Sequence, residues 1–418
     1  QEGKTDIALK LYNQVLKIDP NHSQSLNNLG VIFQNQMNHE KAKDYYEKAI
    51  EIDPNYAEAH NNLGNIFKEL GDNQKAKECY EKAIEIKPDY ANAHFNLGII
   101  FKALKDYQKA KECYEKAIEL NPNNADAYNN LGNEFTTLGE NQKAKECYEK
   151  AIEIDPNYVN AHNNLGVIFK ELGENQKAKE CYEKAIVINP NYTLAHNNLG
   201  IIFKALKDYQ KAISCYEKAI ELNPNYANAH NNLGIIYADL GENQKAKNCY
   251  EKAIAIIPNY ANAHNNLGII FKELNDYQKA IDCYEKAIAI NPNYANSHNN
   301  LGVIYADLGE NQKAKDCFKK AIKINSNYAD AHNNLGIIFR ELGENQKAKN
   351  CYEKVIEIKP DYAQAHNNLG IIFNELNDFQ KAKECFEKTI KINPNYADAH
   401  NNLLKTLYQL DDQSILFK

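Results

Sequence analysis

Three residue types that can do chemistry recur along this chain at a constant spacing of 34 residues. Asparagine, histidine and cysteine each occupy a fixed position of the repeated unit, so the chain carries columns of amides, imidazoles and thiols. Imidazoles and thiolates bind metals, whereas an amide offers a hydrogen-bond donor and an acceptor together. The elements that carry these columns decide which of these chemistries the chain can use.

The asparagine column is the most regular, because an asparagine precedes a Leu-Gly pair in one copy of the unit after another. Asparagine is a mediocre helix former, so its repeated use in a helix requires a reason. An amide can pair with the backbone of an extended peptide, but it can equally cross-link neighbouring helices, and both interpretations stay open. The candidate peptide-binding residues are Asn62, Asn96, Asn130, Asn164, Asn198, Asn232, Asn266, Asn300, Asn334 and Asn368.

The cysteines all share one position of the unit, which predicts a packing role. Packed helix axes lie about 8–10 Å apart, whereas a disulfide needs Cα atoms within about 7 Å, so cysteines of adjacent copies should not reach each other. We expect small half-buried apolar side chains in a reducing, cytoplasmic compartment. The ten are Cys79, Cys113, Cys147, Cys181, Cys215, Cys249, Cys283, Cys317, Cys351 and Cys385.

The unit that positions these columns is a pair of helices, as residues 57–90 illustrate. We expect a first helix from Ala57 to Leu70, and Gly71-Asp72-Asn73 then supplies a turn. A second helix is expected from Gln74 to Ile86, and it ends before Pro88 because proline excludes the α conformation from the residue before it.

The two helices of a pair should approach closely where their residues are small. Gly64 and Ala76 allow that approach, while Leu63, Phe67 and Tyr80 fill the seam between the helices. One such seam is too small to offset about 1–2 kcal/mol of backbone ordering entropy per residue. Each pair must therefore stack on its neighbours, and stability is collective.

The period of 34 residues, the Leu-Gly pair, the alanine and aromatic positions of the second helix and the connecting proline together resemble the tetratricopeptide repeat. The resemblance implies an all-α, right-handed superhelical α-solenoid of antiparallel helix pairs. Residues 1–22 match the end of a truncated repeat, residues 23–396 form eleven tandem repeats, and residues 397–418 form a final first helix with a divergent cap. Because the chain opens inside a repeat, we expect the natural protein to extend further towards the N-terminus.

In this family, the face that carries Glu58, Asn62, Asn65 and Glu69 lines a concave groove. The asparagines are similar to the ladder in the superhelical repeat region of O-linked N-acetylglucosamine transferases. The ninth position of the unit, beside the ladder, is apolar in nine of the eleven whole repeats. An exposed apolar stripe would mark a partner site, but the next first helix could also bury it.

The histidine column occupies a position where the family often has a large aromatic residue, so we expect His60, His94 and their equivalents to pack rather than to bind metal. No glycine-rich phosphate loop, nucleophile elbow or metal-binding doublet occurs in the sequence. We therefore expect no cofactor, no metal site and no enzyme activity in this chain.

The expected function is a protein-protein interaction scaffold that binds a partner protein or an extended peptide in the concave groove, alone or as a component of a larger assembly. The alternative is the substrate-recognition arm of a glycosyltransferase-like enzyme whose catalytic domain is not in this chain. The net charge of −7 arises from 49 basic and 56 acidic residues mixed along the whole length, which argues against nucleic acid. No run of apolar residues approaches the length of a membrane helix.

Overall fold

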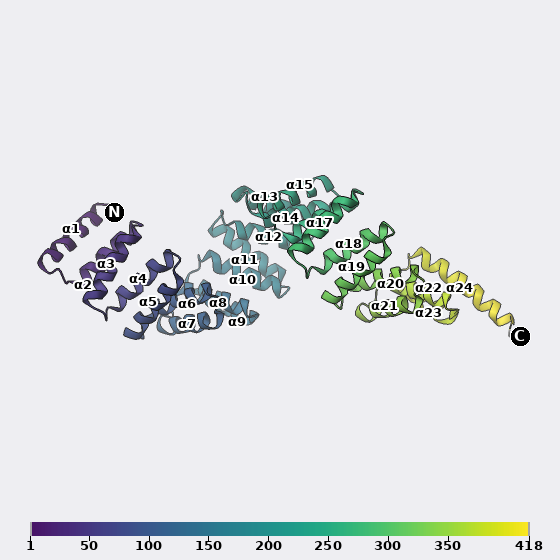
Figure 1. Ribbon diagram of the computed structural model, residues 1–418, viewed down its shortest axis with the longest axis horizontal. Coiled ribbons are helices and arrows are strands. Elements are labelled where there is room, and N and C mark those ends of the chain that lie inside the picture. The colour runs from purple at the N-terminus through teal and green to yellow at the C-terminus, as the bar shows by residue number, and fades with distance from the viewer. Residues whose placement is uncertain (1, 417–418) are drawn as a thin grey trace. The chain divides into compact units, whose positions relative to one another are not determined.

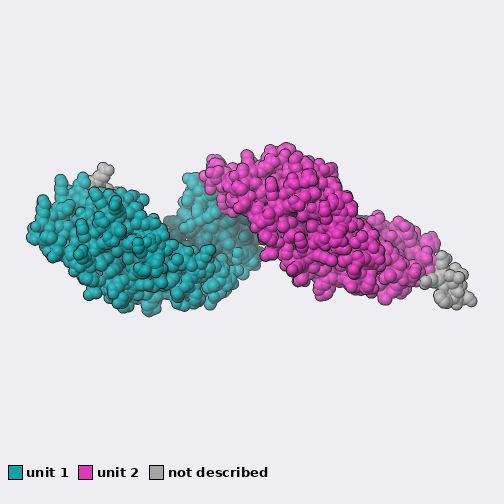
Figure 2. All heavy atoms as spheres, viewed as in Figure 1, with its two compact units in different colours: residues 1–208 teal, residues 209–418 magenta. Residues whose placement is uncertain are grey.

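The computed structural model describes the backbone of residues 2–416 and the side chains of residues 5–411. Within that range the chain is all helical, with α-helices joined by short loops and no strand (Figure 1). Contacts between residues divide the chain into two compact units, unit 1 from Gln1 to Asp208 and unit 2 from Tyr209 to Lys418 (Figure 2). None of the described helices is both long and apolar enough to cross a membrane.

Unit 1 begins on a second helix, and its repeats then alternate a first helix of 13 residues with a second helix of 14. Its helices are α1 (Glu2–Ile18), α2 (Ser23–Asn35), α3 (His39–Ile52), α4 (Ala57–Glu69), α5 (Asn73–Ile86), α6 (Ala91–Ala103), α7 (Tyr107–Leu120), α8 (Ala125–Thr137), α9 (Asn141–Ile154), α10 (Val159–Glu171), α11 (Asn175–Ile188) and α12 (Thr193–Ala205).

Unit 2 repeats the same alternation and closes on a longer helix of 20 residues. Its helices are α13 (Tyr209–Leu222), α14 (Ala227–Asp239), α15 (Asn243–Ile256), α16 (Ala261–Glu273), α17 (Tyr277–Ile290), α18 (Ala295–Asp307), α19 (Asn311–Ile324), α20 (Ala329–Glu341), α21 (Asn345–Ile358), α22 (Ala363–Glu375), α23 (Phe379–Ile392) and α24 (Ala397–Leu416). Residues 417–418 of the predicted terminal cap, like Gln1, lie outside the described part of the chain.

Within each unit the helices of a repeat pack on each other and on the helices of the adjacent repeats. The expected all-helical solenoid of paired helices is therefore confirmed. The seam also has the predicted composition, since Tyr80 and Ala76 are fully buried and Leu63 is nearly so. A Cβ atom added to Gly64 would lie 2.7 Å from Cε1 of Tyr80, so only glycine lets the tyrosine ring reach this depth.

The turn between the two helices of a repeat requires one residue with positive φ. Gly71 fills this position at φ 79°, whereas Lys105 adopts φ 62° in the next repeat without the freedom of glycine. An aspartate follows in both turns and caps the second helix, because Oδ1 of Asp106 accepts a hydrogen bond from the backbone N–H of Lys109 at 3.3 Å. The cap helps to hold the strained turn.

Lysines of two adjacent repeats converge on most of the phenylalanines at the outer edge of the seam. The ammonium of Lys109, from the same repeat, lies 5.4 Å from the ring centre of Phe101, and that of Lys77, from the preceding repeat, lies at 5.7 Å. Cation–π attraction at such exposed sites contributes about 0.5–1 kcal/mol. These contacts link neighbouring repeats in addition to the buried seam.

Candidate peptide-binding face

The predicted asparagines lie one to each first helix, at the same helical position, and we call them the ladder asparagines. All are half-buried except Asn368, which is 7% exposed. Their order is Asn62 on α4, Asn96 on α6, Asn130 on α8, Asn164 on α10, Asn198 on α12, Asn232 on α14, Asn266 on α16, Asn300 on α18, Asn334 on α20 and Asn368 on α22. Within each unit they therefore lie on successive first helices.

The ladder asparagines bond to the preceding repeat through a second asparagine column, which we call the inner asparagines. Nδ2 of Asn96, for example, donates to Oδ1 of Asn61 at 3.0 Å, and Asn61 is 4% exposed. Equivalent bonds of 3.0–3.3 Å are made by Asn62, Asn164, Asn198, Asn266, Asn300, Asn334 and Asn368. One N–H of each of these amides is thus committed to holding adjacent repeats together.

The cross-linking of neighbouring helices, which the sequence left open, is observed, but the pairing of two asparagine columns was not foreseen. The sequence signal for it is the second asparagine that stands directly before most ladder asparagines, as Asn61 stands before Asn62. An amide has two N–H donors and two acceptor lone pairs. A ladder asparagine with one cross-repeat bond therefore keeps hydrogen-bonding capacity for a further partner.

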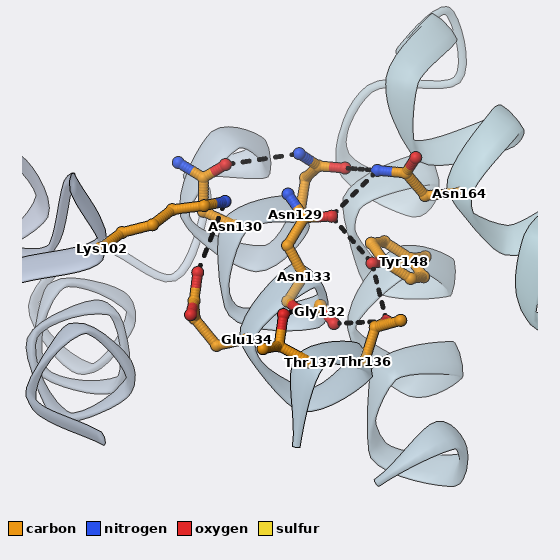
Figure 3. A network of polar contacts seen from close by, with 10 residues as sticks. All are labelled: Lys102, Asn129, Asn130, Gly132, Asn133, Glu134, Thr136, Thr137, Tyr148 and Asn164. Atoms are coloured by element: carbon orange, nitrogen blue, oxygen red, sulfur yellow. Dashed lines mark hydrogen bonds and ion pairs between the residues drawn. The ribbon is translucent and has the colours of Figure 1, made fainter. Parts of the chain in front are cut away.

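The ladder changes at Asn130, where the preceding repeat has Phe95 instead of an inner asparagine. The Oδ1 atom of Asn130 accepts from Nδ2 of Asn129 at 3.4 Å, but no amide stands opposite its own Nδ2 (Figure 3). In the same repeat Glu134 occupies a position that is isoleucine in the other whole repeats. Two departures from the repeat consensus thus occur together.

Glu134 places a carboxyl group where the other whole repeats have an apolar side chain. It is fully buried, and its only charged contact is the ammonium of Lys102, 3.4 Å from Oε1 (Figure 3). Neither carboxylate oxygen has a hydrogen-bond donor in good geometry. Burial raises the pKa of Glu134 above its ordinary value, and Lys102 acts in the opposite direction.

The ninth position of the repeat is one source of a hydrogen-bond partner for the buried tyrosine of the second helix. Where this position is asparagine, the tyrosine hydroxyl donates to it, as Tyr148 does to Oδ1 of Asn133 at 2.9 Å (Figure 3). Where it is isoleucine or valine, the hydroxyls of four tyrosines are buried without a partner. These are Tyr114, Tyr182, Tyr216 and Tyr352.

The isoleucines and valines at the ninth position form what we call the apolar column. Both interpretations of this column hold in part, because most members are half-buried while Val31 and Ile269 are 36% and 37% exposed. The remaining members are Ile99, Val167, Ile201, Ile235, Val303, Ile337 and Ile371. Part of each side chain packs on the next helix, and part faces outwards beside the ladder.

Ladder and apolar column meet in a hollow of about 450 Å³ between α16 and α18 of unit 2. Ile269 and Val303 supply its apolar wall, and Asn300 supplies an amide. Lys272 and Glu273 also line the hollow, and the ammonium of Lys272 lies 3.6 Å from a carboxylate oxygen of Asp307. A site of this composition suits a peptide, which has apolar side chains and a polar backbone.

The histidines connect the first helix to the loop that precedes it. Nε2 of His60 lies 3.0 Å from the carbonyl oxygen of Pro54, so this nitrogen carries the proton and donates. The same contact recurs in the other repeats that carry this histidine, for example between His94 and Pro88. Among the side chains that the structure describes, no group of histidine, cysteine and carboxylate residues could hold a metal ion.

The cysteines are half-buried or buried, and all ten are free thiols. Burial, and to a smaller extent nearby Glu78, raises the pKa of Cys79 to about 12. The pKa values of the other cysteines for which a shift is found are raised to about 11 or 12, with burial as the largest cause. These thiols stay protonated near neutral pH and are poor nucleophiles.

Comparison with protein-family models identifies the repeats along the chain. Models described as tetratricopeptide repeat match residues 22–89, 57–123, 191–258, 225–293, 293–361, 159–192, 363–396 and 113–146. A model described as TPR repeat matches residues 132–173. No curated protein matches the chain significantly in sequence.

A solved structure shares the fold at low sequence identity. A chain from the crystal structure of the APC/C hetero-tetramer Cut9-Hcn1 aligns with a TM-score of 0.55 and 16% identity, over 97% of this chain and 94% of that chain. The crystal structure of the yeast Tom70 aligns with a TM-score of 0.46 and 17% identity, over 94% of this chain and 96% of that chain.

Proposed function

Because this chain belongs to the tetratricopeptide repeat family, we propose that it is a protein-interaction scaffold that holds an extended segment of a partner protein on its first helices. The ladder asparagines, Asn62 to Asn368, would contact the backbone of that segment. The apolar column beside them would take its side chains. Family membership supports the scaffold, and the composition of the first-helix face supports the peptide.

The observation that carries the proposal is the hollow at Ile269, Asn300 and Val303, where an amide and two partly exposed apolar side chains line one concavity. Asn300 donates one N–H to Asn265 at 3.2 Å, which fixes its side chain before any partner arrives. A group held in place beforehand loses little conformational freedom on binding. Its second N–H would then bond to a peptide carbonyl, for about 0.5–1.5 kcal/mol net.

The test uses peptides selected from a random phage-displayed library on the wild-type chain. The variant Ile269→Asn with Val303→Asn removes the apolar wall, and the fold accommodates it because Asn65 and Asn133 occupy this position natively. We expect the selected peptides to bind this variant about thirtyfold more weakly, since two apolar contacts of about 1 kcal/mol each are lost.

Val187→Asn is the matched control, because Val187 is 74% exposed on a second helix and outside the hollow. It should leave the affinity of the selected peptides unchanged in fluorescence anisotropy. Peptides that bind the double variant as tightly as the wild type, or that lose affinity only on the control variant, would refute binding at this hollow.

A further inference from the structure

Unit 2 has a second, larger hollow of about 680 Å³ that residues of α17, α18 and α19 line. Ile288 of α17, Ile324 of α19 and Pro292 of the connecting loop line it with apolar surface. Lys320 and Lys323, both from α19, add two ammonium groups. No ladder asparagine and no member of the apolar column lines this hollow, so it is separate from the peptide face proposed above.

The charge of α19 differs from that of the other second helices at two positions. Lys319 stands where every other whole repeat has glutamate, and Lys323 stands where most repeats have glutamate. In α5 the corresponding glutamates neutralise lysines, with Lys77 3.6 Å from Glu81 and Lys82 3.0 Å from Glu85. Each replacement in α19 therefore adds a positive charge and removes the partner of a neighbouring lysine.

Among the described side chains, Lys313 is the one lysine of α19 with a carboxylate within ion-pair distance, and four others have none. They are Lys315, Lys319, Lys320 and Lys323. Glu344, the N-cap residue of α21, has a lowered pKa. The first cause is its bond to Lys347, and Lys315 and Lys319 also lower it, so this carboxylate offsets part of their charge. Lys320 and Lys323, which line the hollow, are not among the lysines that act on Glu344.

The remaining wall of the hollow is rigid and carries no charge of its own. His298 is 6% exposed, and its Nε2 lies 3.1 Å from the carbonyl oxygen of Pro292. Burial lowers the pKa of His298, and Lys320 lowers it further, so the ring is neutral near neutral pH. The hollow thus combines an apolar floor with two lysines that form no ion pair with any side chain in the described part of the chain.

We infer that this hollow docks an acidic peptide segment of a partner protein, with one apolar side chain of the segment seated on Ile288, Pro292 and Ile324. Acidic residues on either side of that apolar residue would pair with Lys320 and Lys323. The apolar floor is what selects a peptide, because an isolated small anion would gain only two flexible ammonium groups there. The whole chain has a net charge of −7. The two lysines that replace glutamates in α19 make the surface of this hollow positive instead.

The direct test measures fluorescence anisotropy of a short labelled peptide in which a leucine is flanked by glutamates. Lys323→Glu restores the residue of most other repeats and the pairing with Lys320, so the variant should fold at least as well as the wild type. We expect it to weaken binding of the peptide about tenfold, because a favourable charge contact becomes repulsive.

Lys391→Glu is the matched control, since Lys391 occupies the same position in α23 and the charge change is identical. It should change the affinity less than about twofold, as expected for a distant screened charge. Equal losses in both variants, or an unchanged affinity in Lys323→Glu, would overturn the proposal.

Two further measurements distinguish other occupants of the hollow. A labelled peptide of glutamates without the leucine, and inorganic phosphate as a competitor, should each bind about tenfold more weakly than the leucine peptide. If either binds equally well, the hollow is a simple anion site and the proposal fails. It also fails if sedimentation shows wild-type self-association that Lys323→Glu abolishes, because the occupant is then a second copy of this chain.

Discussion

Glu134 replaces an apolar residue at the most buried position of the first helix. Folding removes its carboxylate from water and leaves it one charged contact, with the ammonium of Lys102 at 3.4 Å. Burying an ion is costly, and a single ion pair without further hydrogen bonds often fails to recover that cost. Lys102 keeps 41% of its side-chain surface in solvent, which weakens the attraction further. Glu134 therefore destabilises its repeat.

We predict that Glu134→Ile, which restores the residue of the other repeats, stabilises the chain by about 1–3 kcal/mol near neutral pH. Isoleucine fills the same space with apolar atoms and leaves Lys102 free to face solvent. The measurement is the midpoint of urea unfolding followed by circular dichroism. Ile168→Val, a conservative change at the equivalent position, serves as the control and should destabilise by about 1 kcal/mol.

The gain from Glu134→Ile should depend on pH with a defined sign. Because the pKa of Glu134 is raised in the folded chain, the folded state holds the proton more tightly than the unfolded state. The cost of burying the charge is complete above the raised pKa and disappears as the pH falls below about 4.5. The stability difference between the variant and the wild type should shrink on acidification. A difference that stays constant would mean that the pKa of Glu134 is the same in the folded and unfolded states.

At the scale of secondary-structure elements, the turns between the two helices of a repeat differ in backbone strain. Lys105, at φ 62°, adopts a left-handed backbone conformation at a cost in free energy, whereas Gly71 adopts it without strain in the equivalent turn. Lys105→Gly should raise stability by about 0.5–1 kcal/mol, measured as an increase in the thermal unfolding midpoint. The reverse change, Gly71→Lys, should lower it by a similar amount. Equal effects of the same sign in both variants would contradict this account.

Hydrogen bonds between the ladder asparagines and the inner asparagines hold the first helices of adjacent repeats together. We predict that Asn96→Ala destabilises the chain by about 1–3 kcal/mol, because Asn61 is buried and loses the donor at 3.0 Å. Asn130→Ala should cost clearly less, because Phe95 gives Asn130 no amide to bond across the repeat. Urea unfolding of both variants measures the difference. Equal costs would show that the cross-repeat bonds contribute little.

At the scale of the whole molecule, each helix packs on the other helix of its repeat and on the helices of adjacent repeats within its unit. Stability in such an array is close to a sum of repeat and interface contributions, with no contacts between distant repeats. A set of whole repeats from one unit should therefore retain its fold when it is separated from the rest.

We predict that residues 227–396, which hold five whole repeats of unit 2, form a helical and cooperatively unfolding fragment. The fragment should unfold at a lower temperature than the full chain, because its exposed ends lack neighbours. Circular dichroism at equal residue concentration provides the comparison. An unfolded fragment would show that the repeats depend on contacts beyond their neighbours.

The helix pairs and their seam could be predicted from the sequence because both depend on local patterns. The first helix was expected from Ala57 to Leu70 and runs from Ala57 to Glu69, and the seam of Leu63 and Tyr80 is buried as expected. Turn glycines, helix-ending prolines and apolar spacing act within a few residues. They determine the helices and, through the repeat, the solenoid.

The partners of the polar columns depended on tertiary structure. Asn62 and Asn27 lie 35 residues apart in the sequence, and only the distance between stacked first helices brings Nδ2 of one within 3.0 Å of Oδ1 of the other. The same holds for Lys102 and Glu134, whose pairing follows from the packing of adjacent repeats. Spacing placed each side chain on a face, but the separation of two packed helices decided which atoms meet.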